Sequence, residues 1–166
     1  MRPKTERLNF RPYRLDDLDR LSEWFQNPDM MRYYGGLRDR QETLAWIERL
    51  VRTMDEKGYG YWVLELAGSD EPVGHCGIAD QTVDGTIEPE VGYLLQREYW
   101  GQGYASEAAA ALYDCALTDL GHERIISIID PGNAASIRVA ERNGLQYERT
   151  TVWREHPVSI YAKHKD

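Results

Sequence analysis

The sequence feature that most constrains the fold is a strand made almost entirely of isoleucine. Within residues 124–130, isoleucine fills four of five consecutive positions: Ile125, Ile126, Ile128 and Ile129. Such a near-continuous apolar run is typical of a strand buried on both faces. An alanine-rich helical pattern precedes this run, and a strand pattern over residues 86–96 precedes the helix. Because a strand, a crossover helix and a buried strand in succession form a right-handed parallel unit, this segment predicts parallel strands within a mixed sheet.

Hydrophobic periodicity and turn residues divide the rest of the chain into elements. The first of two early helices is expected to stop at Asn27-Pro28. A capping box of Asp39 and Glu42 starts the second, and Gly121 is expected to close the alanine-rich helix. Strands are expected over residues 8–15, 61–66, 73–78, 86–96, 124–130, about 146–152 and 158–163. These elements predict an α/β (or α+β) fold, with helices on both faces of the sheet, as a single domain over residues 1–166.

The charge balance limits the classes of partner. The chain has 28 acidic and 20 basic residues, a formal net charge of −8. Surfaces that bind nucleic acid are basic, so this balance argues against nucleic acid as the main partner and is compatible with a cationic acceptor. No apolar run approaches the roughly 20 residues that a membrane span requires, so no membrane partner is expected.

The two cysteines, Cys76 and Cys115, have neither metal-ligand spacing nor the density of a disulfide scaffold. Both lie in apolar stretches, which favours reduced, buried thiols and no metal. The N-terminal segment also lacks the apolar run of a secretory signal. We therefore expect a cytoplasmic protein, either a monomer or a homodimer.

A glycine-rich turn carries the strongest chemical signal. Gly101 and Gly103 lie between the strand pattern at 86–96 and the alanine-rich helix. Glycines that open a helix let a ligand approach its free N–H groups and the positive end of its dipole, an arrangement that suits a phosphate or pyrophosphate. An isolated G-x-G by itself favours only a tight strand-to-helix turn. The P-loop lysine is absent, and the turn lies too late in the chain for a dinucleotide fingerprint.

Three segments carry a resemblance to a known family: PEVGYLL, WGQGYASEA and NAASIRVAERNGL. Together they resemble the GNAT superfamily of N-acetyltransferases and, within it, the RimJ/RimL-like branch, which is named for enzymes that acetylate N-termini of ribosomal proteins. The resemblance covers essentially the whole chain. It implies a seven-stranded, mostly antiparallel sheet with a central, splayed parallel strand pair, and acetyl-CoA as the cosubstrate.

The resemblance also implies roles for particular residues. The turn and the first helical N–H groups would hold the pyrophosphate, and the main chain of the preceding strand would bond the pantetheine arm and the acetyl carbonyl. Asn133 and Ser136 match the branch's Asn-x-x-Ser and would line the pantetheine end, although Asn133 could also be a helix N-cap. The coenzyme-binding residues expected on this basis are Tyr93, Leu94, Leu95, Gly101, Gln102, Gly103, Tyr104, Ala105, Ser106, Asn133 and Ser136.

The implied reaction is direct attack of a primary amine on the acetyl group. Glu90 is the first choice for the base that accepts the amine's proton, with His75 and Glu88 as alternatives. A structural carboxylate at 90 and a packing histidine at 75 are the competing readings. The departing thiolate would be protonated by Ser136 or a tyrosine.

Tyr33 and Tyr34, in a loop that walls the acceptor pocket in this family, are the candidate acceptor contacts together with Glu90. The acceptor would be a protein N-terminal amine or a small amine such as a polyamine, aminoglycoside or amino-acid analogue. A coenzyme-binding regulatory module without turnover is the alternative from another class.

Overall fold

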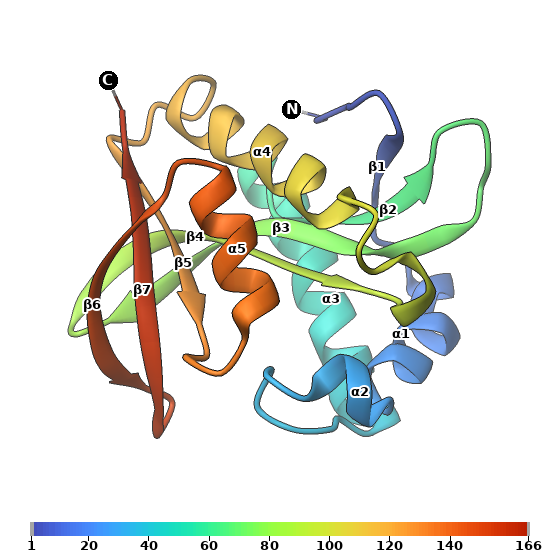
Figure 1. The fold of residues 1–166 in the computed structure, drawn as a ribbon. Helices are drawn as coiled ribbons and strands as arrows, with labels where there is room; N and C mark the ends of the chain where they lie inside the picture. The colour runs from blue at the N-terminus through green and yellow to red at the C-terminus, as the bar shows by residue number, and fades with distance from the viewer. Residues whose placement is uncertain (1, 166) are drawn as a thin grey trace.

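The computed structural model describes residues 2–165, which form one sheet with helices packed on it (Figure 1). The seven strands in this part of the chain are β1 (Leu8–Pro12), β2 (Tyr61–Leu66), β3 (Pro72–Val83), β4 (Thr86–Leu95), β5 (Arg124–Ile129), β6 (Gln146–Trp153) and β7 (His156–His164). The helices are α1 (Leu18–Phe25), α2 (Pro28–Met31), α3 (Arg40–Lys57), α4 (Tyr104–Leu117) and α5 (Ala134–Arg142), with short 3-10 turns at Leu15–Asp17 and Arg97–Tyr99.

The strand order across the sheet is β1-β2-β3-β4-β5-β7-β6. Every neighbouring pair is antiparallel except β4 and β5, which run parallel and pair only at Glu90 and Ile126. Beyond that single pairing the two strands diverge. The expected fold class is confirmed, including the mostly antiparallel sheet and the splayed parallel pair that joins β4 through α4 to β5.

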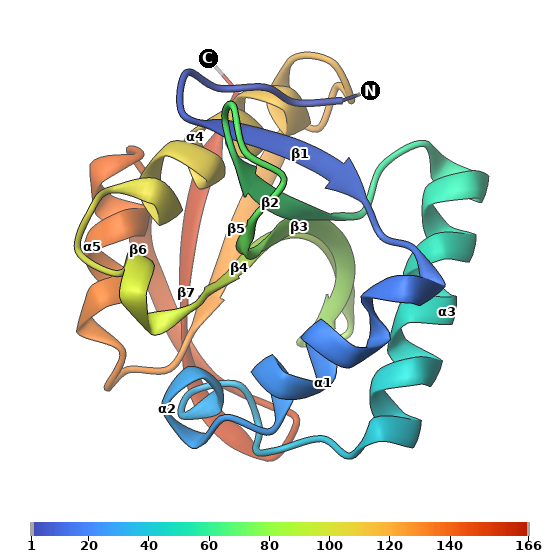
Figure 2. The same cartoon turned by 90° about the vertical axis from the view of Figure 1, so that its right-hand side faces the viewer.

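Helices cover both faces of the sheet, as Figure 2 shows with α4 and α5 on one side and α1 and α3 on the other. Helix α4 buries alanine and leucine side chains, such as Ala108, Ala109 and Leu112, against β3, β4 and β5. The opposite face buries Trp24, Phe25 and other apolar residues of the early helices against the sheet. Burial of this apolar surface supplies the main favourable term in folding.

Helix α3 begins and ends where its local sequence dictates. The Asp39 carboxylate accepts a hydrogen bond from the N–H of Glu42, and the Glu42 carboxylate accepts one from the N–H of Asp39, both 2.8 Å long. Gly58 ends the helix with φ of 72°, a left-handed conformation that glycine adopts without steric cost. The capping box was correctly predicted.

Several predicted boundaries need correction. The first strand ends at Pro12, because a 3-10 turn begins at Leu15. Helix α1 ends at Phe25, and Asn27 starts α2, since its side chain accepts hydrogen bonds from the N–H groups of Asp29 and Met30. Helix α4 ends at Leu117, before the Gly121 at which it was expected to close.

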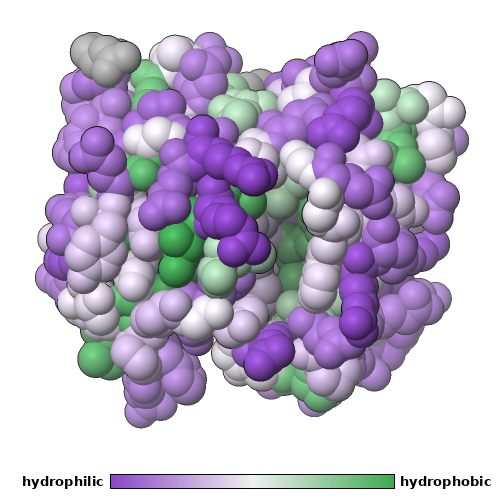
Figure 3. Space-filling model, viewed as in Figure 1, coloured by the Kyte–Doolittle hydropathy of each residue, from purple (hydrophilic) through white to green (hydrophobic). Residues whose placement is uncertain are grey.

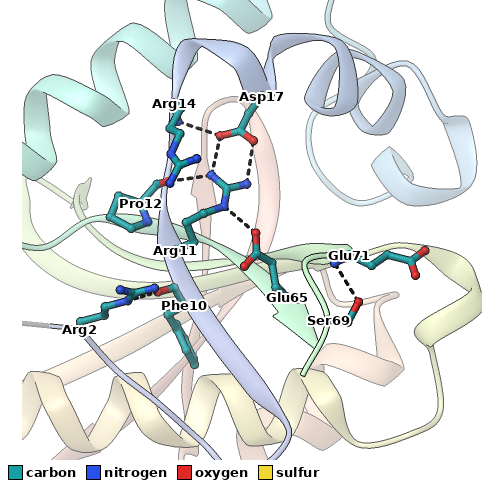
Figure 4. A network of polar contacts seen from close by, with 9 residues as sticks. All are labelled: Arg2, Phe10, Arg11, Pro12, Arg14, Asp17, Glu65, Ser69 and Glu71. Carbon is teal, nitrogen blue, oxygen red and sulfur yellow. Dashed lines mark hydrogen bonds and ion pairs between the residues drawn. The ribbon is translucent and has the colours of Figure 1, made fainter. Parts of the chain in front are cut away.

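An ion-pair network ties the first strand to its neighbours (Figure 4). Arg11 Nε lies 2.6 Å from Glu65 Oε1 on β2, and Arg11 Nη2 lies 2.8 Å from Asp17 Oδ1. The Asp17 carboxylate also accepts a 2.8 Å hydrogen bond from the main-chain N–H of Arg14. These contacts hold the turn between β1 and α1 against the sheet.

Across residues 2–165, no helix is both long and apolar enough to cross a membrane.

Candidate active site

The residues predicted for catalysis and acceptor binding meet around one large cavity. It has a volume of about 1030 Å³ and is lined by parts of β4 and β5 where these strands diverge. Figure 3 shows the molecule hollowed near the middle of this face, with hydrophobic surface inside the hollow. Eight predicted site residues line the cavity: Tyr33, Tyr34, His75, Glu90, Tyr93, Leu94, Asn133 and Ser136. Leu95 and the glycine turn, residues 100–103, lie outside this lining.

The edge of β4 that faces β5 exposes main-chain groups to the gap. The N–H of Gln96 bonds to Val73 on β3. Because main-chain groups of successive residues in a strand point to alternate sides, those of Tyr93 and Leu95 face away from β3. The Tyr93 carbonyl accepts a 2.8 Å hydrogen bond from the Tyr34 hydroxyl, and the Leu95 carbonyl accepts one of 2.8 Å from Trp100 Nε1. The loop that carries Tyr34 is thereby fixed to β4.

The glycine turn opens α4 with unpaired N–H groups. Gly101 and Gly103 have φ of 72° and 84°, and Gly103 is the N-cap. The first main-chain bond of the helix runs from Glu107 to Gly103, so the three N–H groups before Glu107 have no partner within the helix. A Cβ on Gly103 would lie 3.4 Å from Arg7 Nη2. The turn thus meets the geometric needs of an anion site.

Arg7, which directly precedes β1, contacts this turn and the first turn of α4. Its Nε lies 2.6 Å from Glu107 Oε2, and its Nη1 donates a 2.9 Å hydrogen bond to the Gln102 carbonyl. Its guanidinium also lies over the Tyr104 ring, 4.5 Å from the centroid. Tyr104 therefore packs against Arg7.

Glu90 is a buried carboxylate at the single pairing of β4 with β5. It is 8% exposed, and burial raises its pKa from 4.5 to about 7. Gln81 on β3 donates a 2.9 Å hydrogen bond to Glu90 Oε2, which opposes that rise, as do the main-chain amide of Ile128 and the charge of Arg154. A carboxyl group with a pKa near neutrality can accept a proton and release it again at neutral pH.

His75 lies in an aromatic shell. Its Nδ1 is 2.7 Å from the Tyr13 hydroxyl, and the Trp46 ring lies 5.3 Å away, centroid to centroid. Burial lowers the pKa of His75 to about 3, with the charge of Arg38 acting in the same direction. His75 is therefore neutral at physiological pH, and one of its ring nitrogens is already occupied. Glu88, the other alternative base, lies 3.0 Å from Arg124 in an ion pair.

Asn133 and Ser136 form the first turn of α5. The Asn133 side chain accepts a 3.2 Å hydrogen bond from the N–H of Ser136, which makes Asn133 the N-cap of the helix. Both side chains are buried and line the cavity. The Tyr93 hydroxyl donates a 3.3 Å hydrogen bond to the Ser136 carbonyl, so the start of α5 is fixed to β4.

Two glycines make room for a tyrosine that sequence reasoning missed. Gly77 and Gly92 pair across β3 and β4. A Cβ on Gly77 would lie 2.3 Å from the Tyr61 ring, and one on Gly92 would lie 2.2 Å from the Tyr61 hydroxyl. The ring therefore lies flat on the glycine pair, and Tyr61 lines the cavity beside Glu90.

Gln81 was missed because β3 was expected to end at residue 78. The signal was present in Asp84-Gly85, a two-residue turn with φ of 51° and 79°, flanked by Val83 and Thr86, which pair. An Asp-Gly pair between β-branched residues favours a hairpin of this kind. Extending β3 back from that turn would have brought Gln81 beside β4.

Residues 7–146 match the sequence profile of a family described as the acetyltransferase (GNAT) domain. The chain belongs to the GNAT family. Two relatives from Bacillus species cover most of it. YkkB of Bacillus subtilis (strain 168) is 40% identical over 141 residues, 84% of this chain and 81% of that protein. A Bacillus licheniformis protein named N-acetyltransferase p20 is 30% identical over 156 residues, 92% of this chain and 85% of that protein.

Solved structures of acetyltransferases match the fold over nearly the full length. An acetyltransferase from Agrobacterium tumefaciens str. C58 superposes with a TM-score of 0.86 and 28% identity, covering 99% of this chain and 95% of that one. RimL, a ribosomal L7/L12 alpha-N-protein acetyltransferase in complex with coenzyme A, superposes with a TM-score of 0.81 and 20% identity. The match covers 99% of this chain and 97% of that one. The aminoglycoside acetyltransferase AAC(6')-Ib, in complex with coenzyme A and kanamycin, superposes with a TM-score of 0.78 and 18% identity. The match covers 95% of this chain and 94% of that one.

Proposed function

We propose that this GNAT N-acetyltransferase moves the acetyl group of acetyl-CoA directly to a primary amine, and that the amine enters the cavity at Glu90. The family and the buried carboxylate support this reaction. Acetyl-CoA supplies an activated acetyl group as a thioester. The chain's own residues bind the two substrates, orient them and move protons between them.

The coenzyme follows the β5-facing edge of β4 in this proposal. The free N–H groups of residues 102–106 bond the pyrophosphate, and the positive end of the α4 dipole favours its charge. Support comes from Gly103, whose missing side chain leaves the turn open to close approach. Of the three residues predicted to bond the pantetheine arm, Leu95 does so through its N–H, which faces the gap, whereas the main chain of Leu94 faces β3. The N–H of Tyr93, which faces the gap, donates to the acetyl oxygen as negative charge develops there.

Glu90 is the proposed base, and its burial with a pKa of about 7 is the observation that carries the proposal. At neutral pH a large fraction of Glu90 is ionised and can take the proton of the acceptor's ammonium group. The neutral nitrogen then forms a bond to the acetyl carbon as the bond from carbon to sulfur breaks. His75 is the weaker choice, because its Nδ1 is held by Tyr13 and a low pKa makes it a poor proton acceptor.

The departing thiolate needs a proton, and Ser136 is the proposed donor. Burial raises the pKa of Tyr34 to about 12, with a hydrogen bond to Ser136 acting in the opposite direction. The Tyr34 hydroxyl therefore remains protonated at neutral pH and lies beside Ser136. A proton passed from Ser136 to the thiolate can be replaced from this tyrosine or from the acceptor nitrogen.

The acceptor is proposed to be either a protein N-terminal amine, as expected for the RimJ/RimL-like branch, or a small amine. Solved structures of similar fold include enzymes named for both kinds of acceptor. A volume of about 1030 Å³ is at the upper end of the range for small-molecule sites, so it accommodates either a small amine or the first residues of a peptide.

The test is release of free CoA thiol from acetyl-CoA in the presence of amines. We expect thiol release that depends on both the protein and a primary amine, with the acetylated amine detected by mass spectrometry. Comparison of short peptides with polyamines and aminoglycosides then separates the acceptor classes. Binding of acetyl-CoA without thiol release from any amine would instead support a regulatory module.

A further inference from the structure

Three arginines from distant parts of the sequence gather at the cavity. Arg38 comes from the loop before α3, Arg49 from α3 itself and Arg154 from the turn between β6 and β7, and all three line the cavity. They are close enough for the charges of Arg154 and Arg49 to lower the pKa of Arg38, in addition to the larger effect of burial. Like charges in proximity repel one another, and an anion bound between them offsets that repulsion.

None of the three arginines has a carboxylate within ion-pair distance anywhere in residues 2–165. Two arginines elsewhere that are mostly buried, Arg11 and Arg124, are by contrast each paired with two carboxylates. Arg38 is half-buried, and its guanidinium lies over the rings of Phe25 and Trp46, 4.7 and 6.0 Å from their centroids. A half-buried guanidinium held by aromatic rings and lacking an acidic partner is suited to bind an external anion.

The backbone at Arg154 is strained. Trp153 and His156 pair, so Arg154 and Glu155 form a two-residue turn with φ of 49° and 67°. Glycine and asparagine are the usual residues at such positions, and a long side chain there is uncommon. The Arg154 guanidinium lies 4.1 Å from the centroid of the Trp153 ring, and its Nη2 donates a 3.4 Å hydrogen bond to Gln81 Oε1. The turn thus holds a guanidinium at the cavity.

The charge of the cavity is opposite to that of the chain. Its lining has five cationic residues (Arg32, Arg38, Arg49, Lys57 and Arg154) and three acidic ones (Asp80, Glu90 and Asp130). Lys57 and Asp80 form an ion pair with each other. The net charge of −8 over the whole sequence therefore does not extend into the cavity. The sequence argument that the acidic excess of the chain is compatible with a cationic acceptor therefore does not apply to this site.

We propose that the acceptor amine also carries an anionic oxygen group, a carboxylate or a phosphate, which binds Arg38, Arg49 and Arg154 while the amine lies at Glu90. This inference rests on the proposed function and names the class of its substrate. Gln81 connects the two ends of the site, since it accepts from Arg154 and donates to Glu90. Guanidinium groups bind carboxylate and phosphate oxygens with paired, charge-assisted hydrogen bonds. The coenzyme's pyrophosphate is not the expected occupant, because the glycine turn lies outside the cavity lining.

The experiment compares matched amines that differ only in the anionic group. β-Alanine is paired with β-alaninamide, phosphoethanolamine with ethanolamine, and a dipeptide ending in a free carboxylate with its C-terminal amide. For at least one pair we expect kcat/KM from thiol release to be about tenfold or more higher for the anionic member. The carboxylate and phosphate arms identify which group the arginines prefer.

Variants assign the preference to the arginines. Arg49→Gln, at an exposed position, and Arg38→Gln should each bring the ratio of anionic to neutral kcat/KM close to one. The matched control is Arg40→Gln, because Arg40 is exposed, pairs with Asp19 and does not line the cavity. Equal kcat/KM for anionic and neutral members in the parent protein, or a preference that survives both cavity variants, overturns the inference. Absence of thiol release with every amine overturns the proposed function instead.

Discussion

Gln81 Nε2 donates a 2.9 Å hydrogen bond to Glu90 Oε2. The two residues lie on adjacent strands, where Ala79 pairs with Glu90 and Gln81 is the diagonal neighbour. The bond stabilises the ionised carboxylate and so opposes the effect of burial on its pKa. We predict that Gln81→Met moves the rising limb of kcat/KM against pH to higher pH, because the pKa of Glu90 rises further.

The control for this prediction is Gln146→Met, which removes an exposed glutamine of β6 outside the cavity lining. Its pH profile should match that of the parent. A Gln81→Met profile with lower amplitude but an unmoved limb would mean that Gln81 only shapes the cavity.

Glu90 should reduce stability at neutral and alkaline pH. Its pKa is about 7 in the folded protein against an ordinary value of 4.5, so the folded state holds this proton over that window while the unfolded state has lost it. The contribution of Glu90 to stability is therefore highest below pH 4.5 and is lost as pH rises to about 7. Glu90→Gln should raise the free energy of unfolding above pH 7 by about 3 kcal/mol at most.

Denaturant unfolding of the parent and Glu90→Gln at several pH values measures this difference. The gain should shrink as pH falls and disappear near pH 4.5. A difference that is constant with pH would show that Glu90 does not titrate differently in the folded state.

The glycine turn provides a test of coenzyme binding with a built-in control. Gly103 and Gly121 both have positive φ, 84° and 70°, so an alanine at either position carries a similar backbone cost of about 1 kcal/mol. Only Gly103 lies at the start of α4. We predict that Gly103→Ala reduces the rise in Tm produced by CoA, whereas Gly121→Ala lowers Tm but leaves that rise intact. Equal rises in the two variants would remove the turn from the coenzyme site.

Ser136 and Asn133 should differ in what they contribute. Ser136→Ala is expected to lower kcat more than it weakens CoA binding, because protonation of the leaving thiolate matters mainly in the transition state. Asn133→Ala removes the N-cap of α5, so it should cost about 1 kcal/mol of stability and also weaken CoA binding. Asn133→Asp keeps the cap and should recover the stability. Steady-state kinetics and CoA titration separate these effects, and an unchanged kcat in Ser136→Ala would remove that residue from the catalytic group.

Most of the fold could be predicted from the sequence, because the strongest hydrophobic patterns lie within single helices and strands. The isoleucines of β5 and the alanines of α4 define a parallel unit through burial pattern alone. The segment after Asn27 shows where such reading fails. An Asn-Pro pair can end one helix and cap the next, and only the hydrogen bonds to Asp29 and Met30 decide that α2 follows.

The candidate site could be predicted only in part, because its chemistry depends on contacts between segments that are far apart in the sequence. Glu90 was predicted from its place on the strand before the glycine turn. Its pKa depends on burial, on Gln81 of β3 and on Arg154 of a hairpin turn, and no periodicity links these positions. The arginines of the cavity also come from three separate elements, and in a chain with an acidic excess their local concentration leaves no compositional signal.

The most direct test of the account is the pH dependence of kcat/KM for amine acetylation in the parent protein and in Glu90→Gln. The account predicts that the parent's kcat/KM rises with pH through about 7, where Glu90 loses its proton. In Glu90→Gln this limb should disappear and kcat/KM at neutral pH should fall by about a hundredfold, as expected for loss of a general base. A variant as active as the parent over the whole pH range, with the same limb, would contradict the assignment of Glu90 as the base.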